Sequence, residues 1–364
     1  MEYAVDTTVN RNAVAVARKA ESLGFDSIWF ADSPVVAGDV FVGLGAVAAA
    51  TDRIRIGPGV CVPWARNPVV TASAFGALNA LAPGRVEMTF GTGFSARRGL
   101  GLPPMKYTDF SEHVRTVLGL LDGKEVEVAT DGGIKRVRLL HPDALNLEDV
   151  MEVFIAGSGP RIQGFAADIR ANILDHPTLL ALGFADWMSS IESRWTRVAG
   201  SPTGLRVSLT MSVIVLREGE TLDSPRVRAI AAPLAMNPVH YWTDELLVRH
   251  KQLPESLPEV VRDAVDKYVA LIQSRKDSAA LHTEIHKGHA LFVRTDASDI
   301  LTSELMAQVC IIGKTDSVRE QIESLAALGV RRIVIPVIPG YEDSMEDLAR
   351  CFELPKRQRP GISR

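Results

Sequence analysis

The amino-acid sequence predicts a (β/α)8 barrel, in which eight parallel strands alternate with helices. Two observations lead to this fold class. Eight short runs of β-branched and other apolar residues recur along the chain, and the segments between them carry apolar residues at helical spacing. The chain has 364 residues, 46% of them hydrophobic, which suits one large domain with a sizeable core. We therefore expect a single barrel domain over residues 1–354.

The eight predicted strands end at turn residues, most often at glycine. In chain order they cover residues 3–5, 27–30, 54–56, 85–90, 153–156, 171–174, 205–216 and 333–335. Helices are predicted over residues 10–23, 40–50, 69–81, 110–121 and 315–328, and also after Pro160. The segment 94–106 lies between the fourth strand and the next helix. We expect it to be a polar loop.

Two insertions interrupt the alternation. Residues 124–129 and 135–140 alternate around a turn at 130–133, so 122–150 is predicted to be a β-hairpin outside the barrel, following the fourth helix. Residues 217–312 separate the seventh and eighth strands and contain several helical stretches, so they form a long helical insertion. Because it follows the carboxyl end of a strand, this insertion could cap the barrel mouth, or it could be purely structural. Residues 355–364 are expected to be a basic, solvated tail.

Composition and charge exclude several classes of partner. A net charge of −4 and a pI near 6.1 give no basic surface for nucleic acid or an acidic membrane. Three widely spaced cysteines suggest neither a disulfide framework nor a zinc site. The N-terminus carries acidic residues where a signal peptide would be basic, and the longest apolar run, 40–50, is too short to cross a bilayer. We expect a cytoplasmic protein.

Glycine-rich loops follow the third, fourth and fifth strands. These are Gly57-Pro58-Gly59, Gly91-Thr92-Gly93 and Gly157-Ser158-Gly159. Glycine lets a ligand approach the backbone closely, and parallel α/β folds place their binding sites at the carboxyl ends of the strands. The second loop lacks the third glycine of the dinucleotide fingerprint, and no P-loop lysine follows it. Ordinary turns remain the alternative explanation.

Four short motifs in this region resemble one enzyme family. GPGV at 57–60, NPVVTASAFGALN at 67–79, PGR at 83–85 and FGTG at 90–93 are similar to the luciferase-like superfamily of flavin and deazaflavin oxidoreductases. The nearest likeness is to methylenetetrahydromethanopterin reductases and their relatives. The resemblance implies a luciferase-like TIM barrel that binds a flavin-type ring at its carboxyl mouth and acts on a small organic substrate.

Two cofactors fit this resemblance. With the deazaflavin F420 the enzyme would transfer a hydride to or from the substrate. With reduced FMN it would be a monooxygenase supplied by a separate flavin reductase; a separate F420 reductase is the corresponding partner for the deazaflavin. The GPGV loop favours F420 slightly. In those relatives a non-prolyl cis peptide lies behind the ring, and the matching bond here is Gly59–Val60.

The resemblance also implies a set of cofactor-binding residues. The loop after the fifth strand matches a family motif that helps to hold the cofactor phosphate, and a helix that starts at Pro160 leaves backbone N–H groups free for an anion. A plain strand-to-helix turn is the alternative. The full set of expected cofactor-binding residues is Gly59, Val60, Gly91, Thr92, Gly93, Ala156, Gly157, Ser158 and Gly159.

Residues at the ends of the strands are candidates for the chemistry. By position these are Asp6, Asp32, Ser33, Trp64, Phe94, Ser95, Ser158 and His176. As the only histidine among them, His176 could donate a proton near neutral pH, although a structural histidine is as common there. Several relatives have a histidine after the strand-two aspartate, where this chain has Ser33. We therefore take His176, Asp32 and Ser33 as catalytic candidates, and Trp64 and Phe94 as substrate contacts.

Two other motifs point to different chemistry, and neither is complete. His282, His286 and His289 invite a metal interpretation, but Glu284 does not follow the first histidine as it does in HExxH. We predict a solvated helical face there and no metal site. Ser158 lies between two glycines as in a nucleophile elbow, but Ala156 replaces the first glycine of that motif. A serine hydrolase is a remote alternative.

The helical segments 40–50 and 69–81 are apolar on nearly every side. A surface helix of a barrel should have a polar face, so something must cover these two. A second subunit is the simplest cover, and an insertion of the same chain is the alternative. Luciferase-like enzymes commonly dimerise through this side of the barrel, so the resemblance implies a homodimer.

Overall fold

Eight parallel strands form one sheet in the computed structural model, which describes residues 1–176, 184–275 and 281–356. Their order around the sheet is β3-β2-β1-β12-β9-β8-β7-β4, and isolated parallel bridges from Ile56 to Val86 and from Cys61 to Phe90 join the two edge strands. The sheet is therefore a closed barrel, as predicted. The strands are β1 (Glu2–Thr7), β2 (Ser27–Phe30), β3 (Arg55–Pro58), β4 (Glu87–Phe90), β7 (Glu152–Ala156), β8 (Asn172–Asp175), β9 (Val207–Thr210) and β12 (Val330–Pro336).

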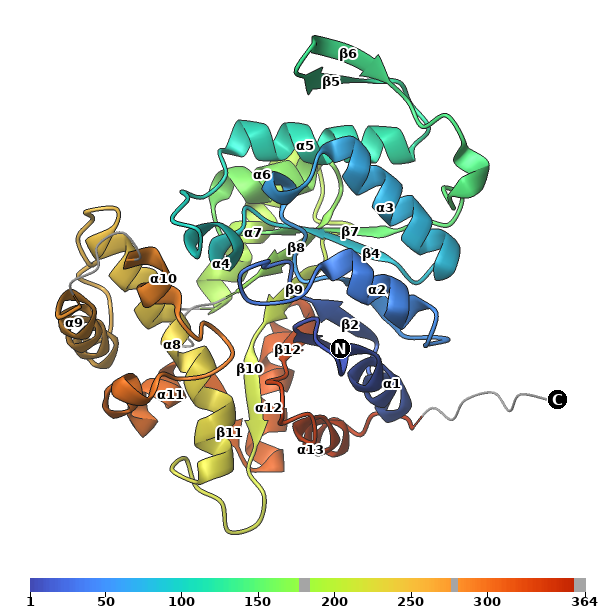
Figure 1. Ribbon diagram of the computed structural model, residues 1–364. Helices are drawn as coiled ribbons and strands as arrows, with labels where there is room; N and C mark the ends of the chain where they lie inside the picture. The colour runs from blue at the N-terminus through green and yellow to red at the C-terminus, as the bar shows by residue number, and fades with distance from the viewer. Residues whose placement is uncertain (177–183, 276–280, 357–364) are drawn as a thin grey trace.

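Helices surround the barrel and bury its outer face (Figure 1). They are α1 (Ala13–Leu23), α2 (Val40–Ala48), α3 (Pro68–Leu81), α5 (Tyr107–Leu121), α6 (Pro160–Asp168), α7 (Phe184–Ala199), α12 (Thr315–Ala327) and α13 (Ser344–Cys351). Local sequence sets their ends. Gly24, at φ 91°, ends α1 in the left-handed conformation, and the Asn67 side chain accepts a hydrogen bond from Val69 N at the start of α3.

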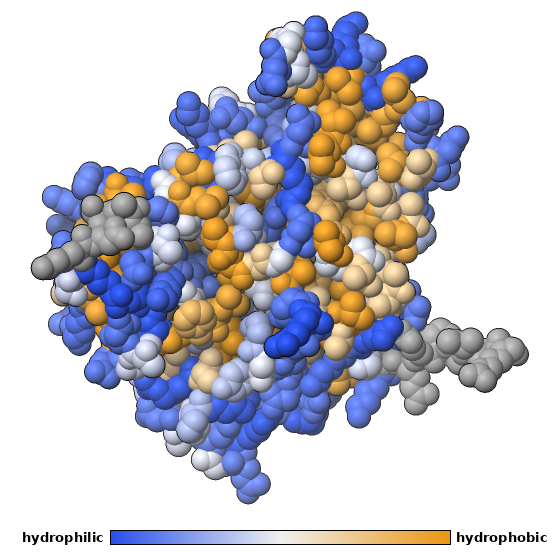
Figure 2. All heavy atoms as spheres, in the orientation of Figure 1, coloured by the Kyte–Doolittle hydropathy of each residue, from blue (hydrophilic) through white to orange (hydrophobic). Residues whose placement is uncertain are grey.

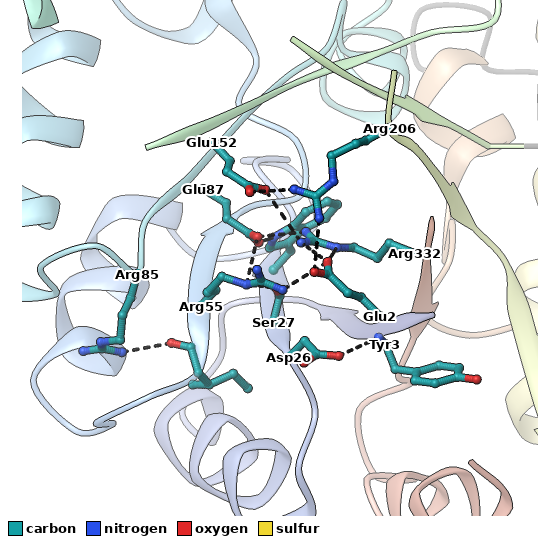
Figure 3. A network of polar contacts seen from close by, with 12 residues as sticks. Glu2, Tyr3, Asp26, Ser27, Arg55, Arg85, Glu87, Glu152, Arg206 and Arg332 are labelled. Carbon is teal, nitrogen blue, oxygen red and sulfur yellow. Dashed lines mark hydrogen bonds and ion pairs between the residues drawn. The ribbon is translucent and has the colours of Figure 1, made fainter. Parts of the chain in front are cut away.

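The inside of the barrel is filled in layers. A middle layer of apolar side chains comes from five strands: Ala4, Trp29, Phe154, Leu174 and Val334. Below it, at the amino ends of the strands, lies a network of charged side chains around Arg332 (Figure 3). Above it, the strands open into a cavity. The packed lower layers leave the carboxyl mouth as the end of the barrel that can accept a ligand.

The predicted hairpin is present and projects from the barrel. Strands β5 (Val126–Thr130) and β6 (Gly133–Val137) pair antiparallel and lie beyond α5, at the top of Figure 1. The segment η2 (Pro142–Ala144) follows β6, and Leu145 then packs against Gly76 of α3. The insertion therefore touches the outside of the barrel and leaves the mouth open.

The prediction of one long seventh strand over 205–216 is wrong. The chain leaves the barrel after β9, and β10 (Ser212–Val215) pairs in parallel with β11 (Cys310–Gly313) in a separate two-stranded sheet. Met211 N still bonds to Val334 O of β12, but the residues after it pair with β11. Because the β-branched pattern continues through this point, it gives no sign that the pairing partner changes.

The helical insertion between β10 and β11 has a hydrophobic core of its own. Its elements are α8 (Pro225–Leu247), α9 (Glu259–Gln273), α10 (Leu281–His286), η3 (Thr295–Ile300) and α11 (Ser303–Val309). They lie together beside the barrel, at the left of Figure 1. The insertion includes β10 and β11, which both lie outside the barrel. It therefore begins before the predicted boundary at residue 217.

The segment 94–106 is not simply a polar loop. It begins with the short helix α4 (Phe94–Arg98), which follows β4 directly, and Arg97 and Arg98 of this helix are buried. The segment η1 (Pro63–Ala65) lies earlier in the chain, between β3 and α3. Buried carboxylates and a backbone carbonyl satisfy these two arginines, so their charge was a poor guide to exposure. Most of the predicted basic tail, residues 357–364, lies outside the described residues. No helix among the described residues is long and apolar enough to cross a membrane.

Candidate active site

A cavity of about 450 Å³ lies at the carboxyl mouth of the barrel. All eight strands or the loops that follow them contribute to its wall, and the insertion adds Leu234, Asn237 and Tyr241 from α8 and residues 289–291. The insertion therefore caps part of the mouth. The cavity volume falls within the range of small-molecule sites, and apolar side chains provide most of the lining with a few polar groups between them.

Most of the residues singled out from the sequence meet in this cavity. Those that line it are Asp6, Asp32, Ser33, Gly59, Val60, Gly91, Thr92, Gly93, Phe94, Ser95, Ala156, Gly157, Ser158 and His176. Two expected residues do not line it. Gly159 is the residue before the first turn of α6, and Trp64 is 44% exposed on the surface, where the Arg97 guanidinium lies 5.2 Å from its ring centroid.

The floor of the cavity is formed by the backbone of the third and fourth strand loops. The Gly59–Val60 peptide is cis, as the family resemblance implied. A Cβ atom on Gly91 would lie 2.5 Å from Val60 Cγ2, and one on Gly59 would lie 2.7 Å from Asp6 Oδ1. These contacts are too close for any side chain. Glycine at both positions therefore lets the two loops and β1 pack together beneath a bound ligand.

Ser158 has a side-chain partner that the sequence did not reveal. Its hydroxyl donates to Asp175 Oδ1 at 2.5 Å, and the same oxygen accepts the His176 backbone N–H at 2.7 Å. Trp187 Nε1 donates to the other oxygen at 3.0 Å. Asp175 is buried at the end of β8. Because the Ser158 proton is committed to this carboxylate, the loop offers an anion its backbone N–H groups and not this hydroxyl.

Asp32 and Ser33 are held by neighbouring loops. Asp32 Oδ2 accepts from Val62 N at 3.0 Å and from Arg66 Nη1 at 2.7 Å. Burial would lower the pKa of Arg66, but Asp32 outweighs it and raises that pKa. The Ser33 and Ser95 hydroxyls are 2.7 Å apart. Asp32 thus holds the loop after β3 in place.

Asp6 differs from the other carboxyl groups of the cavity, Asp32 and Asp175, because one of its oxygens has no partner. Its Oδ1 atom is closed off from solvent and has no hydrogen-bond partner. Burial raises the pKa of Asp6 well above its usual range, against a backbone hydrogen bond at Thr7 that lowers it. Asp6 is therefore easier to protonate than an exposed aspartate. Its position at a strand end was visible in the sequence, but its isolation from basic side chains was not.

The histidines of the insertion are not on a solvated face, which corrects our expectation. His286 and His289 are buried and meet His240 of α8, with His240 Nδ1 3.0 Å from His289 Nδ1. Burial, then His286 and His176, lower the pKa of His289 to about 3, and burial also lowers that of His240 well below its usual range. This cluster could not be predicted from the sequence because His240 lies far from the HTEIH motif.

Arg98 joins α4 to the insertion. Its Nη1 atom donates to Asp244 Oδ2 at 2.6 Å and its Nη2 atom to Glu245 Oε1 at 2.7 Å, and all three side chains are buried. The guanidinium carbon also lies 4.6 Å from the ring centroid of Phe94 and 4.8 Å from that of Tyr241, two cavity-lining aromatics. This arginine therefore fixes the cap to the barrel beside the cavity.

Comparisons with known proteins match the whole barrel. The family model described as "Luciferase-like monooxygenase" matches residues 3–332. The 5,10-methylenetetrahydromethanopterin reductase of Methanolobus tindarius is 24% identical over 341 residues, which cover 91% of this chain and 92% of that protein. The F420-dependent glucose-6-phosphate dehydrogenase of Beutenbergia cavernae is 33% identical over 175 residues, covering 43% of this chain and 51% of that protein.

Solved structures show the same fold. The coenzyme F420-dependent tetrahydromethanopterin reductase from Methanopyrus kandleri superposes with a TM-score of 0.64 at 19% identity, covering 96% of this chain and 97% of its own. An F420-dependent secondary alcohol dehydrogenase in complex with an F420-acetone adduct also gives 0.64, at 16% identity, covering 98% of this chain and 99% of its own. The overall fold is thus shared with these proteins.

Proposed function

We propose that this chain, which belongs to the luciferase-like monooxygenase family, is an F420-dependent oxidoreductase. In this proposal it transfers a hydride to or from a small organic substrate. The observation that carries the proposal is the cavity at the carboxyl mouth, with an apolar floor, glycine loops on three neighbouring strands and one carboxyl group whose pKa is raised by burial. The full-length likeness to a 5,10-methylenetetrahydromethanopterin reductase supports the deazaflavin.

The residues present fit a flat ring with a phosphate-bearing chain. Val60 and Leu174 offer apolar surface, and the glycines of the third and fourth strand loops keep side chains away from the floor. When bound, F420 supplies a ring carbon that gives or accepts a hydride. The protein's part is to position that ring, exclude water from it and handle the proton that accompanies the hydride.

We place the cofactor phosphate at the start of α6. The Gly157 N–H donates to Leu174 O and is not free. Ser158 and Gly159 precede a helix whose first residue is proline. The backbone N–H groups of that turn and the positive end of the helix dipole therefore face away from the helix. Arg161 lies exposed in the same turn. The Gly91-Thr92-Gly93 loop is close enough to contribute, since it lines the same cavity.

A matched pair of substitutions at Gly159 tests the phosphate site. The position has no atom within 4 Å of an added Cβ, and Asp and Asn are equally good residues for the start of a helix. Gly159→Asp should weaken cofactor binding about 10-fold relative to Gly159→Asn, because the added charge repels the phosphate. Equal dissociation constants for the two folded variants at low salt would remove α6 from the site.

We propose Asp6 as the proton donor of the reaction. Reduction of a polar double bond adds a hydride at carbon and a proton at the neighbouring oxygen or nitrogen, and the raised pKa of Asp6 suits its carboxyl group in the cavity to supply that proton. His176 lines the same wall and remains a second candidate, with Asp32 and Ser33 assigned to holding loops. Phe94 and Tyr241 would face the substrate, which favours one with an apolar part.

The alternative is an FMNH2-dependent monooxygenase with a separate reductase. It is supported by the fold shared with the monooxygenase RslO1 from Streptomyces bottropensis, which has a TM-score of 0.60 at 14% identity. Anaerobic titration with reduced FMN and with oxidised and reduced F420, followed by fluorescence, separates the two. We expect saturable binding of F420. Binding of reduced FMN alone would replace our proposal with the alternative. A serine hydrolase is not supported, since the Ser158 hydroxyl bonds to a carboxylate and not to an imidazole.

We also propose that the protein is a homodimer through α2 and α3. Val42 is 74% exposed on α2, and Val70 and Leu81 are each 56% exposed on α3. Figure 2 shows the apolar surface that they belong to, at the upper right, over α2, α3 and the base of the hairpin. Burying this surface against a second copy would remove it from water.

Light scattering at micromolar concentration tests the dimer. The double substitution Val42→Glu and Val70→Glu should shift the protein from dimer to monomer, because it places charges in an apolar interface. Val198→Glu on α7 is the control, since Val198 is also exposed but lies away from α2 and α3. A monomeric wild type would contradict the proposal.

A further inference from the structure

We propose that His240, His286 and His289 form a binding site for a divalent transition-metal ion of the zinc class, between the insertion and the cavity. These three residues are the only group of its kind among the described residues: one possible ligand atom from each lies within 4.8 Å of the others, and all three side chains are buried. The site is separate from the residues proposed to hold the cofactor, so it does not depend on the proposed function.

The spacing of the nitrogens suits a metal ion. In a tetrahedral zinc site with Zn–N distances of 2.0–2.1 Å, two ligand nitrogens lie about 3.4 Å apart. His240 Nδ1 and His289 Nδ1 are 3.0 Å apart, slightly closer than that, and the third nitrogen lies within the 4.8 Å limit. Small side-chain rotations would bring the three to ligand distances, and the backbone need not move.

His286 already has the hydrogen bond that metal-binding histidines use. Its Nε2 atom faces Asp244 Oδ1 at 3.4 Å, which makes Nε2 the protonated nitrogen and leaves the lone pair on Nδ1. That Nδ1 atom is buried and has no hydrogen-bond partner. An unpartnered buried nitrogen is costly, and a metal ion would satisfy it. Asp244 would act as a positioning residue that fixes the tautomer of His286.

The charged side chains around the cluster are paired with one another. Arg98 and Arg249 bind the carboxylates Asp244 and Glu245, while Arg294 is paired with Glu284 and Asp296. The nearby positive charges are thus neutralised. The Phe94 ring packs against His286 and His289, with centroids 5.9 and 5.5 Å apart, and Tyr268 packs against His240 at 5.3 Å, so the ligands lie in a largely apolar shell.

Three histidines leave one position of a tetrahedral ion open. Structural zinc sites use four protein ligands, whereas sites that act on a substrate keep one position for water or the substrate. Of the three ligands only His289 lines the cavity, so we place the open position on that side. There the ion would polarise an oxygen of a molecule bound in the cavity. The competing account is a hydrogen-bonded pair of core histidines with no affinity for metal.

Metal titration of the whole purified chain distinguishes these accounts. After treatment with a chelator, the protein is titrated with Co²⁺, followed by its visible absorption, and with Zn²⁺, followed by calorimetry. We expect one ion per chain and the absorption of a tetrahedral Co²⁺ site with nitrogen ligands. His286→Gln and His289→Gln should each weaken Zn²⁺ binding at least about 100-fold. Asp244→Asn should weaken it about 10- to 100-fold, as losing such a partner does elsewhere.

His282→Gln is the matched control. His282 belongs to the same HTEIH motif, but its ring lies against Gly101 and is not part of the cluster. This variant should bind Zn²⁺ as the wild type does. The proposal is overturned if the wild type takes up no Zn²⁺ at micromolar concentration, or if His282→Gln loses as much affinity as His286→Gln. If a cluster variant fails to fold, as circular dichroism would reveal, the Zn²⁺ titration of the wild type alone decides the test.

Discussion

The amino end and the carboxyl end of this barrel both bury charged residues. At the amino end the buried charged side chains form ion pairs with one another, whereas at the carboxyl end some buried polar atoms have no partner. At the bottom, Arg332 is 2.9 Å from Glu87 and 2.5 Å from Glu2 (Figure 3). Trp29 Nε1 also donates to Glu87, at 2.6 Å. At the mouth, Asp6 keeps an oxygen without a partner, and His286 keeps a nitrogen. The two ends are separated by a single apolar layer of side chains.

The difference separates stability from function within one barrel. A buried polar group without a partner lowers stability, so it persists where a ligand or a reaction uses it. Removing a paired charge from the bottom should therefore cost stability and leave the mouth unaffected. Removing the unpaired Asp6 carboxyl group from the mouth should cost activity and little or no stability. Substitutions at each end test this contrast.

The largest effect is expected for Arg332→Met. This change leaves the buried carboxylate of Glu87 and that of Glu2 without their main partner, so the free energy of unfolding should fall by about 3–5 kcal/mol. Urea unfolding followed by circular dichroism measures it. Cofactor affinity, measured on the folded protein, should be unchanged. An unfolding free energy within about 1 kcal/mol of the wild type would show that the network does not hold the barrel together.

Arg98→Met should have a smaller effect, about 2–3 kcal/mol. Arg98 is as buried as Arg332, and in both cases the carboxylates left behind keep other partners: Arg249 and Lys251 for Arg98, and Arg55 and Arg206 for Arg332. The effect is smaller because Arg98 joins the insertion to α4 and does not lie inside the barrel. Since Arg98 ties the cap to the mouth, this variant should also bind cofactor less tightly. A loss as large as that of Arg332→Met would mean that the cap is part of the barrel's stability core.

Asp6→Asn should abolish most activity without loss of stability. Turnover should fall about 100-fold or more, because the proton donor is gone. A carboxyl whose pKa is raised in the folded state stabilises the fold only below its ordinary value of 3.8, and this contribution is lost as the pH rises towards the raised pKa. The asparagine variant should therefore gain stability relative to wild type as the pH rises.

Urea unfolding of both proteins at about pH 5 and about pH 8 checks this sign. The expected result is a difference in favour of the asparagine variant that grows with pH. A difference that stays the same at the two pH values would mean that Asp6 is already ionised in the folded protein at pH 5, and it would remove Asp6 as a proton donor.

The smallest effect is expected at the exposed pair of Lys124 and Asp122. The two side chains are 2.8 Å apart, but both are more than half exposed, so Lys124→Gln should change the unfolding free energy by less than about 0.5 kcal/mol. The same urea measurement serves as the baseline for the buried variants. A loss comparable with that of Arg98→Met would show that burial is not what makes the network at the bottom of the barrel strong.

The strands and glycine loops could be predicted because their signals are local. Alternation, β-branching and a glycine at the end of a run are visible within a few residues, and the loops at 57–60 and 91–93 do line the cavity. The break between β9 and β10 could not be predicted, since the residues on both sides are equally β-branched. Only the tertiary partner of each strand tells them apart.

The side-chain partners of the site residues could not be predicted from the sequence for the same reason. Ser158 bonds to an aspartate 17 residues away, and His240 bonds to a histidine 49 residues away. Nothing near either residue indicates its partner. Arg97 and Arg98 illustrate the reverse error, because adjacent charges suggested a solvated loop while buried carboxylates and a carbonyl oxygen pair them. Motifs located the cavity, but they did not describe its electrostatics.

The insertion is attached to the barrel in a way that allows it to be replaced as a unit. It leaves on β10 and returns on β11, which are hydrogen-bonded to each other, and it has a hydrophobic core of its own. Lengthening or replacing a segment whose two ends are already held together costs the barrel little entropy. Such an arrangement lets selection, or a protein engineer, change the cap over the mouth and hence the shape of the cavity, while the eight strands and the floor of the cavity stay the same.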